Sequence, residues 1–66
     1  MKNNLKVERA IKDITQEELA RQIGVTRQAI NSVELGKYVP STILALKLSR
    51  YFNKTVNKIF SLEEDD

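Results

Sequence analysis

The chain has 66 residues and a net charge of +2, with 11 lysines and arginines against nine aspartates and glutamates, and it contains neither histidine nor cysteine. Without those two residue types it lacks the usual zinc, copper and iron ligand sets, the Ser-His and Cys-His nucleophile pairs and disulfides. A chain this short buries only about 60% of the surface that its unfolded form exposes, so we expect one small domain over residues 1–66. We predict no enzyme, no metal site and no cofactor.

The first two predicted helices lie in the N-terminal third of the chain. The residues Leu5–Lys12 form the first, with Asn3 or Asn4 as its cap. The second begins after Thr15, because a glutamate three residues further on completes the pattern of a capping box. Gly24 ends this helix, since glycine adopts the left-handed conformation of a C-cap without steric cost.

The second and third predicted helices together have the pattern of a helix-turn-helix. Thr26 begins the third helix directly after the turn, and the helix continues to Leu35 before a second terminating glycine, Gly36. Ala20 is small at the point where the two helices must cross closely. The apolar residues that we expect on the inner faces of the pair are Leu19, Ile23, Ile30 and Val33.

Two more helices follow this motif. Ser41, directly after Pro40, caps a helix that runs to about Phe52, and Thr55 caps a short last helix, Val56–Phe60. The fold class that we predict is therefore all-α, with five helices. The terminal segments left over, either of which could be a short strand, are Met1–Asn4 and Ser61–Glu64.

The outer face of the third helix is polar, and its side chains are Arg27, Gln28, Asn31 and Ser32. Arginine can hydrogen-bond the edge of guanine, and glutamine or asparagine the edge of adenine, when a helix N-terminus is presented to the major groove. In an arbitrary helical bundle the same residues would be ordinary solvated positions. Within a complete helix-turn-helix, this face predicts the reading of DNA bases.

Residues 16–35, followed by Gly36-Lys37-Tyr38 and Pro40-Ser41, resemble the Cro/cI, or Xre-type, helix-turn-helix family of phage repressors. The residues on diagnostic positions of that family are Leu19, Ala20, Ile23, Gly24, Val25, Ile30 and Val33. The resemblance covers roughly residues 4–60 and implies a lambda-repressor-like DNA-binding domain. It extends to the short stand-alone regulators of the cytolysin-repressor kind, in which terminal strands add a small antiparallel sheet and the protein is a dimer.

The resemblance also implies roles for single residues. Base reading falls on Arg27, Gln28 and Ser32, with Asn31 beside them, and phosphate contact falls on Gln16, Thr26, Lys37 and Tyr38. An ion pair between Arg9 and Glu34 would tie the first helix to the third. Tyr38 could instead cover the edge of the core. Leu35 departs from the family pattern, which often has asparagine there, so a polar contact from that position is in doubt.

The charges are unevenly distributed along the chain. Residues 1–62 carry all 11 basic groups and five acidic ones, a net charge of +6, and the acidic tail of residues 63–66 subtracts four. A basic body with an acidic tail suits a partner that is a polyanion, but on charge alone it is equally what a solvated surface with a charged terminus would show. The longest apolar run is Ile43–Leu46, so we expect neither a membrane-spanning helix nor a secretory signal and place the chain in the cytoplasm.

A single motif contacts only about half a turn of DNA sequence, so we expect a homodimer that reads two half-sites. The apolar residues predicted for the dimer interface are Val56, Ile59, Phe60 and Leu62. The alternative is that these residues complete the core of one chain.

The favoured interpretation is a transcriptional regulator that binds double-stranded DNA, a dimeric repressor on a palindromic operator, with no small-molecule ligand. The alternative is an antitoxin-like or adaptor module that mainly binds a partner protein, with DNA binding secondary. An adaptor has no need for Arg27, Gln28 and Asn31 on one polar face, and this feature favours the regulator.

Overall fold

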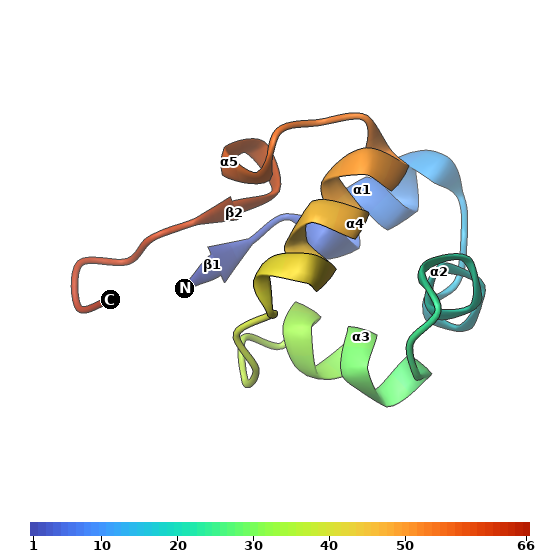
Figure 1. Ribbon diagram of the computed structural model, residues 1–66, viewed down its shortest axis with the longest axis horizontal. Helices are drawn as coiled ribbons and strands as arrows, with labels where there is room; N and C mark the ends of the chain where they lie inside the picture. The colour runs from blue at the N-terminus through green and yellow to red at the C-terminus, as the bar shows by residue number, and fades with distance from the viewer.

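The computed structural model describes residues 1–66 and contains five α-helices and two short strands. In chain order the elements are β1 (Lys2–Asn3), α1 (Leu5–Lys12), α2 (Gln16–Ile23), α3 (Arg27–Glu34), α4 (Thr42–Phe52), α5 (Val56–Ile59) and β2 (Phe60–Ser61). Helices α1 and α4 lie at the centre of the molecule, with α2 and α3 on one side and the strands on the other (Figure 1). The predicted five-helix fold is confirmed. None of these helices has the length and apolar character needed to cross a lipid bilayer.

All five helices follow a predicted capping residue, and at three of them the side chain of that residue makes the capping bond. These three residues are Thr15, Thr26 and Ser41. Each hydroxyl accepts a hydrogen bond from the backbone N–H three residues further on, at 3.0 to 3.1 Å. At α1 the capping bond comes from Asn3, whose Oδ1 accepts from the N–H of Leu5 at 3.1 Å, whereas Asn4 makes none. Thr55 precedes α5 without a capping bond from its side chain.

The turn between α2 and α3 depends on Gly24. This residue has a φ of +86°, in the left-handed region, and its N–H donates to the carbonyl of Ala20 at 2.8 Å. The next N–H, that of Val25, donates to the same carbonyl at 3.0 Å. Both bonds end α2. The chain then reaches the N-cap of α3, Thr26, only two residues after Gly24.

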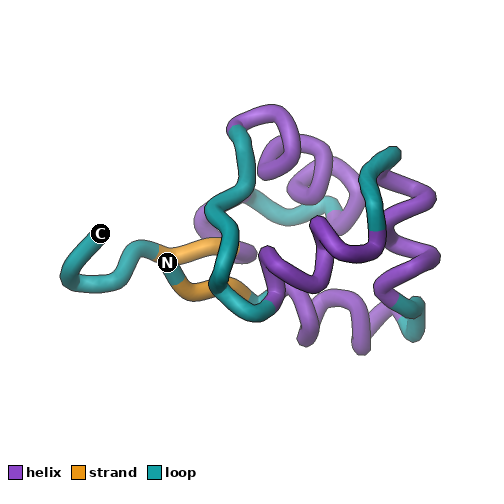
Figure 2. The backbone as a smooth tube through the Cα atoms, turned by 90° about the horizontal axis from the view of Figure 1, so that it is seen from below, coloured by secondary structure: helices purple, strands orange, loops and turns teal.

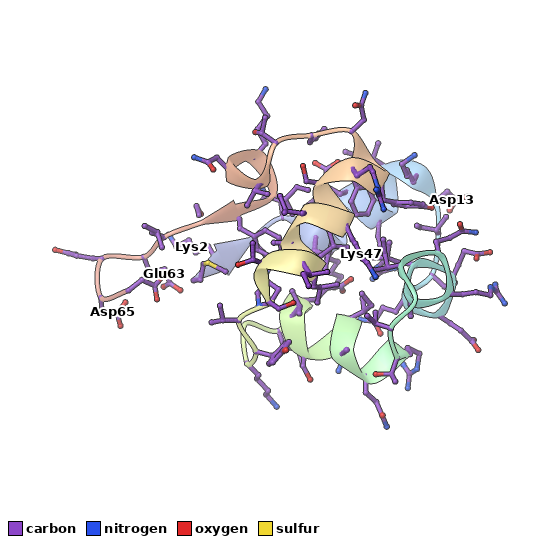
Figure 3. The ribbon with its side chains drawn as sticks, viewed as in Figure 1. Lys2, Asp13, Lys47, Glu63 and Asp65 are labelled. Carbon is purple, nitrogen blue, oxygen red and sulfur yellow. The ribbon has the colours of Figure 1, made fainter.

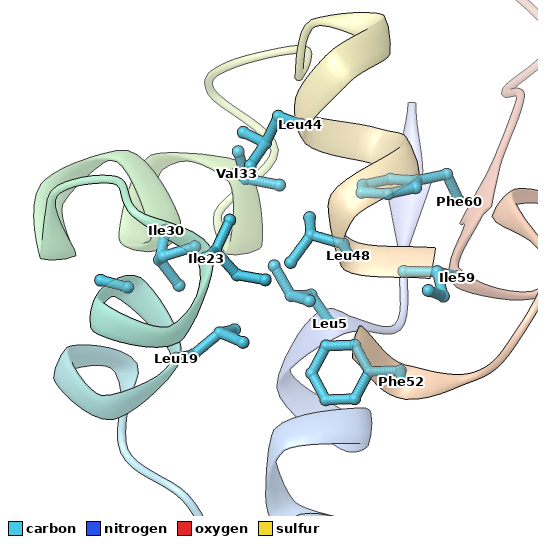
Figure 4. Packing of buried hydrophobic residues seen from close by; sticks show 11 residues of the cluster. Leu5, Leu19, Ile23, Ile30, Val33, Leu44, Leu48, Phe52, Ile59 and Phe60 are labelled. Atoms are coloured by element: carbon cyan, nitrogen blue, oxygen red, sulfur yellow. The ribbon is translucent and has the colours of Figure 1, made fainter. Parts of the chain in front are cut away.

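The core is one cluster of apolar side chains to which all five helices contribute (Figure 4). Its members are Leu5, Leu19, Ala20, Ile23, Ile30, Val33, Leu44, Leu48, Phe52, Ile59 and Phe60. The predicted inner faces of the helix-turn-helix are therefore buried as expected. Because this cluster fixes α2 and α3 from behind, their outer sides are held in one arrangement.

The terminal segments form a two-stranded antiparallel sheet, which the sequence left as one option. Lys2 pairs with Ser61 and Asn3 with Phe60. We predicted that the last helix includes Phe60, and this is wrong: α5 ends at Ile59, because the backbone of Phe60 is extended and pairs with β1. Figure 2 shows the two strands side by side, next to both chain ends.

Helix α1 buries a charged residue that its sequence pattern does not single out. Glu8 is 6% exposed, while the apolar Ile11 is 68% exposed. The carboxylate of Glu8 accepts a hydrogen bond from Lys54 Nζ at 2.8 Å. This ion pair ties α1 to the loop between α4 and α5 and compensates for burying the charge.

Candidate nucleic-acid interface

Helix α3 has one face that points away from the core, toward solvent. It is the lowest helix in Figure 1, and Figure 2 shows the molecule from below. On that side Arg27 and Gln28 are exposed, and Asn31 and Ser32 are half-buried. The exposed pair occupies the first turn, directly after the Thr26 cap. The four predicted base-reading residues therefore occupy one helix, and the two in its N-terminal turn are exposed.

A shallow hollow of about 390 Å³ connects this helix to the loop that follows it. Gln28 and Ser32 line it from α3, Tyr38 from the loop, and Leu44 from α4. Tyr38 is 50% exposed. It therefore borders the same surface as two of the predicted base-reading residues.

The ion pair expected between Arg9 and Glu34 is present. Arg9 Nε donates to Glu34 Oε2 at 2.6 Å and Arg9 Nη2 donates to Glu34 Oε1 at 3.2 Å. The guanidinium also donates to the backbone carbonyl of Ile14 at 2.9 Å. The carboxylate of Glu34 is 5% exposed, and its hydrogen bonds raise the pKa of the Arg9 guanidinium above its ordinary value. One side chain thus joins α1, the loop before α2 and the end of α3.

Gln16 extends this ion pair into a hydrogen-bond network. Its Nε2 donates to Asn31 Oδ1 at 3.0 Å and to Glu34 Oε1 at 3.1 Å. Its Oε1 faces Arg27 Nη1 at 3.5 Å. Sequence reasoning missed these contacts, because they join residues 15 and 18 positions apart and depend on how α2 crosses α3.

The remaining residues expected at phosphates lie on the surface. Thr26, Lys37 and Tyr38 are exposed, at the start of α3 and in the loop after it. Leu35 is 59% exposed and offers no polar group between them. On α2, Glu18 pairs with Arg21 at 3.0 Å, and hydrogen bonds from Arg21 lower the pKa of Glu18.

The acidic tail lies at the other end of the molecule. Glu63 and Asp65 are near Lys2, beyond the sheet and away from α2 (Figure 3). The ammonium group of Met1 is 2.9 Å from Glu63 Oε1 and 3.1 Å from Asp66 Oδ2. We call this group of Met1, Glu63 and Asp66 the terminal clamp. Its ion pairs draw the acidic charge toward the sheet.

The four residues predicted for a dimer interface have different environments. Ile59 and Phe60 are 1% and 6% exposed and belong to the core of a single chain, as the alternative interpretation of these residues held. Val56 packs against that core, and Leu62 is 78% exposed. The other large exposed apolar residues include Val39, Ile43 and Leu46.

Comparison with known proteins agrees with this geometry. The family model described as "Helix-turn-helix" matches residues 5–59. The uncharacterized HTH-type transcriptional regulator MJ0272 of Methanocaldococcus jannaschii is 47% identical over the whole of both chains, and the uncharacterized HTH-type transcriptional regulator YgzD of Bacillus subtilis is 44% identical, again over the whole of both. The HTH-type transcriptional activator BcrR of Enterococcus faecalis is 40% identical over 53 residues, which are 80% of this chain and 26% of that protein. With α2 and α3 arranged as that motif requires, the chain belongs to the Cro/cI-type helix-turn-helix family of transcriptional regulators.

Proposed function

We propose that this protein is a sequence-specific repressor that binds double-stranded DNA with α3 in the major groove. The observation that carries the proposal is the N-terminal turn of α3, on which Arg27 and Gln28 are both exposed. Arginine fits the O6 and N7 acceptors of guanine, and glutamine fits the N6 and N7 of adenine. Repression requires only that the bound protein occupies a promoter. We place this activity in the cytoplasm, where the DNA is.

The contacts that position α3 are made to the DNA backbone. Lys37 and Tyr38 follow α3 and flank its outer side, and Thr26 precedes it. The backbone N–H groups at the start of α2 suit a phosphate oxygen, because a helix N-terminus carries free donors and a positive partial charge. These contacts set the register of the helix in the groove, and base contacts add the sequence preference.

The test compares binding to a preferred duplex and to a scrambled duplex, by fluorescence anisotropy at several salt concentrations. Gln28→Ala should lose affinity for the preferred duplex by about tenfold and keep its affinity for the scrambled one. Gln22→Ala, a change at an exposed glutamine on α2, is the matched control and should bind like the wild type. Equal losses on both duplexes for Gln28→Ala would contradict base reading by this residue.

The proposed repressor acts as a homodimer on a palindromic operator, since one recognition helix reads only half of a two-fold site. We place the interface on exposed apolar residues near the sheet. Val39 lies beside Phe60, with which it lines a small hollow, and Leu62 follows at the end of β2. Ile43 lies four residues after Val39, in the first turn of α4. A second copy of the chain would remove these side chains from water.

Sedimentation equilibrium tests the dimer directly. The wild type should be dimeric at tens of micromolar, and Val39→Asp should be monomeric, because the dimer would bury an unpaired charge. Ile11→Asp is the matched control, since Ile11 is 68% exposed on α1, away from the proposed interface, and Val39 is 65% exposed. A monomeric wild type would contradict the dimer.

A further inference from the structure

The side-chain amide of Gln16 has both of its donors in use. An amide NH2 group carries two N–H donors, and Gln16 Nε2 donates to Asn31 Oδ1 at 3.0 Å and to Glu34 Oε1 at 3.1 Å. The oxygen on the same amide faces a guanidinium nitrogen of Arg27 at 3.5 Å. A DNA phosphate is an acceptor and needs a donor. To donate a hydrogen bond to a phosphate, the Gln16 side chain would therefore have to break one of its bonds inside the protein.

The orientation of this amide follows from the chemistry of its neighbours. A carboxylate oxygen that accepts from a guanidinium is a hydrogen-bond acceptor, and both oxygens of Glu34 accept from Arg9. Gln16 must therefore turn its NH2 group toward Glu34. Its second N–H then points to Asn31, which must supply the acceptor oxygen.

Asn31 is thus held with its carbonyl oxygen toward α2 and its NH2 group free. A two-bond contact from asparagine to adenine uses both ends of the amide, with the oxygen accepting from N6 and the nitrogen donating to N7. The bond from Gln16 takes one of the two lone pairs of the Asn31 oxygen and fixes the direction of this oxygen toward α2. The free NH2 group instead matches guanine, whose O6 and N7 both accept.

We propose that Gln16 is a positioning residue that presents Asn31 to the DNA as a hydrogen-bond donor, so that Asn31 favours guanine over adenine. This role differs from the phosphate contact that the family resemblance implies for Gln16. It rests on the proposed function, since it assigns the specificity of one residue at the same recognition helix. Gln28 has no such partner in the protein and keeps both ends of its amide for adenine.

The test measures the guanine-to-adenine preference at each position of the half-site with a panel of single-substitution duplexes. Asn31→Ala identifies the position that depends on Asn31, where the wild type should prefer guanine by about tenfold. Gln16→Met, which keeps the length of the side chain and removes its donors, should reduce that preference to less than about threefold. The double variant should lose no more than Asn31→Ala alone, because both changes remove one coupled contact. Gln22→Met is the matched control on the same helix and should leave every preference unchanged.

Different outcomes separate this inference from the proposed function. If the wild type discriminates between duplexes but Gln16→Met loses affinity equally on all of them, Gln16 is a phosphate contact and only this inference fails. If the wild type shows no sequence preference, the proposed function fails and this inference fails with it.

A second measurement needs no variant. In the free wild-type protein, NMR should show slower exchange with water for the side-chain amide protons of Gln16 than for those of Gln22 and Gln28, since only Gln16 makes two bonds to partly buried acceptors. Equal exchange at the three glutamines would overturn the proposal, including in the case that Gln16→Met does not fold.

Discussion

Arg9 and Glu34 form a two-point ion pair between α1 and the end of α3, with the shorter contact at 2.6 Å. The Glu34 carboxylate is almost fully buried, and it also accepts the hydrogen bond from Gln16. This carboxylate therefore connects the scaffold behind α3 to the polar side chains in front of it. Its loss should affect both the stability of the fold and the positions of Gln16 and Asn31.

Replacing Glu34 alone should be costly. Glu34→Leu leaves the partly buried Arg9 guanidinium without a charged partner and with only the Ile14 carbonyl as an acceptor. We expect a loss of about 3 kcal/mol in the free energy of unfolding, measured by urea denaturation. The loss is at the lower end for such pairs, because Arg9 keeps some contact with water. The double variant Arg9→Met/Glu34→Leu removes both charges and should recover most of the stability. A single variant as stable as the wild type would show that the pair does not support the fold.

Gly24, in the turn between α2 and α3, allows the cost of a left-handed backbone conformation to be measured without a steric clash. A Cβ added at Gly24 would meet no atom within 4 Å, so the cost of Gly24→Ala comes from the left-handed φ of +86° alone. We expect about 1–2 kcal/mol for alanine and less for Gly24→Asn, since asparagine tolerates this region better. Urea denaturation measures both, with Gln22→Ala on the same helix as control. An equal cost for alanine and asparagine would argue against this explanation.

Local signals in the sequence predicted most of the fold. A hydroxyl residue with the right spacing marks the starts of α2, α3 and α4, and Gly24 marks the turn, because capping and left-handed conformations depend on neighbouring residues. The end of α5 was misplaced by one residue. Phe60 is extended because it pairs with Asn3, and no local pattern reveals a partner so far away in the sequence.

The candidate site was predicted less completely, for the same physical reason. The positions of Arg27 and Gln28 on one face follow from helical spacing. The hydrogen bonds of Gln16 do not, since they require the crossing of two helices to be known. Spacing also cannot tell whether an apolar residue near the chain end faces its own core or a partner. Ile59 and Phe60 prove to face their own core.

The terminal clamp should depend on pH. Ion pairs with Glu63 and Asp66 raise the pKa of the Met1 amine above its ordinary value of 8.0, so the amine supports the clamp fully below that value and loses this effect as pH rises through the raised pKa. Hydrogen bonds from the Glu63 N–H and the Met1 amine lower the pKa of Asp66 below 3.8, so its contribution is complete above that value and is lost as pH falls through the lowered pKa.

We therefore expect the terminal clamp to be closed at a pH between 3.8 and 8.0. It should open as the pH rises through the raised pKa of the amine or falls through the lowered pKa of Asp66. NMR can follow this through the chemical shifts of Lys2 and Ser61, which pair in the adjoining sheet. Asp66→Asn should lower the pKa of the Met1 amine, whereas Asp65→Asn, which lacks a contact with the amine, serves as control. An amine that titrates identically in both variants would rule out the Asp66 contact.

Two basic residues near α3 should differ in what their removal does to DNA binding. Arg27→Ala should cost on the order of 1–3 kcal/mol on the preferred duplex and relax one operator position, because it removes a base contact. Lys37→Ala should weaken binding evenly across sequences and reduce the slope of log affinity against log salt by about 1, because it removes a phosphate contact. Titrations over a series of salt concentrations measure both effects. Arg27→Ala with equal losses on specific and random DNA would contradict the assignment of Arg27 to a base.

If α3 reads a DNA sequence as part of a symmetric dimer, selection of bound sequences from random duplex DNA should recover the operator itself. The wild type should enrich an inverted repeat, with half-sites about one helical turn apart. Arg27→Ala should enrich the same repeat with one position relaxed in each half. Recovery of sequences without a common site would contradict sequence reading, and recovery of a single half-site without its inverted copy would contradict the dimer.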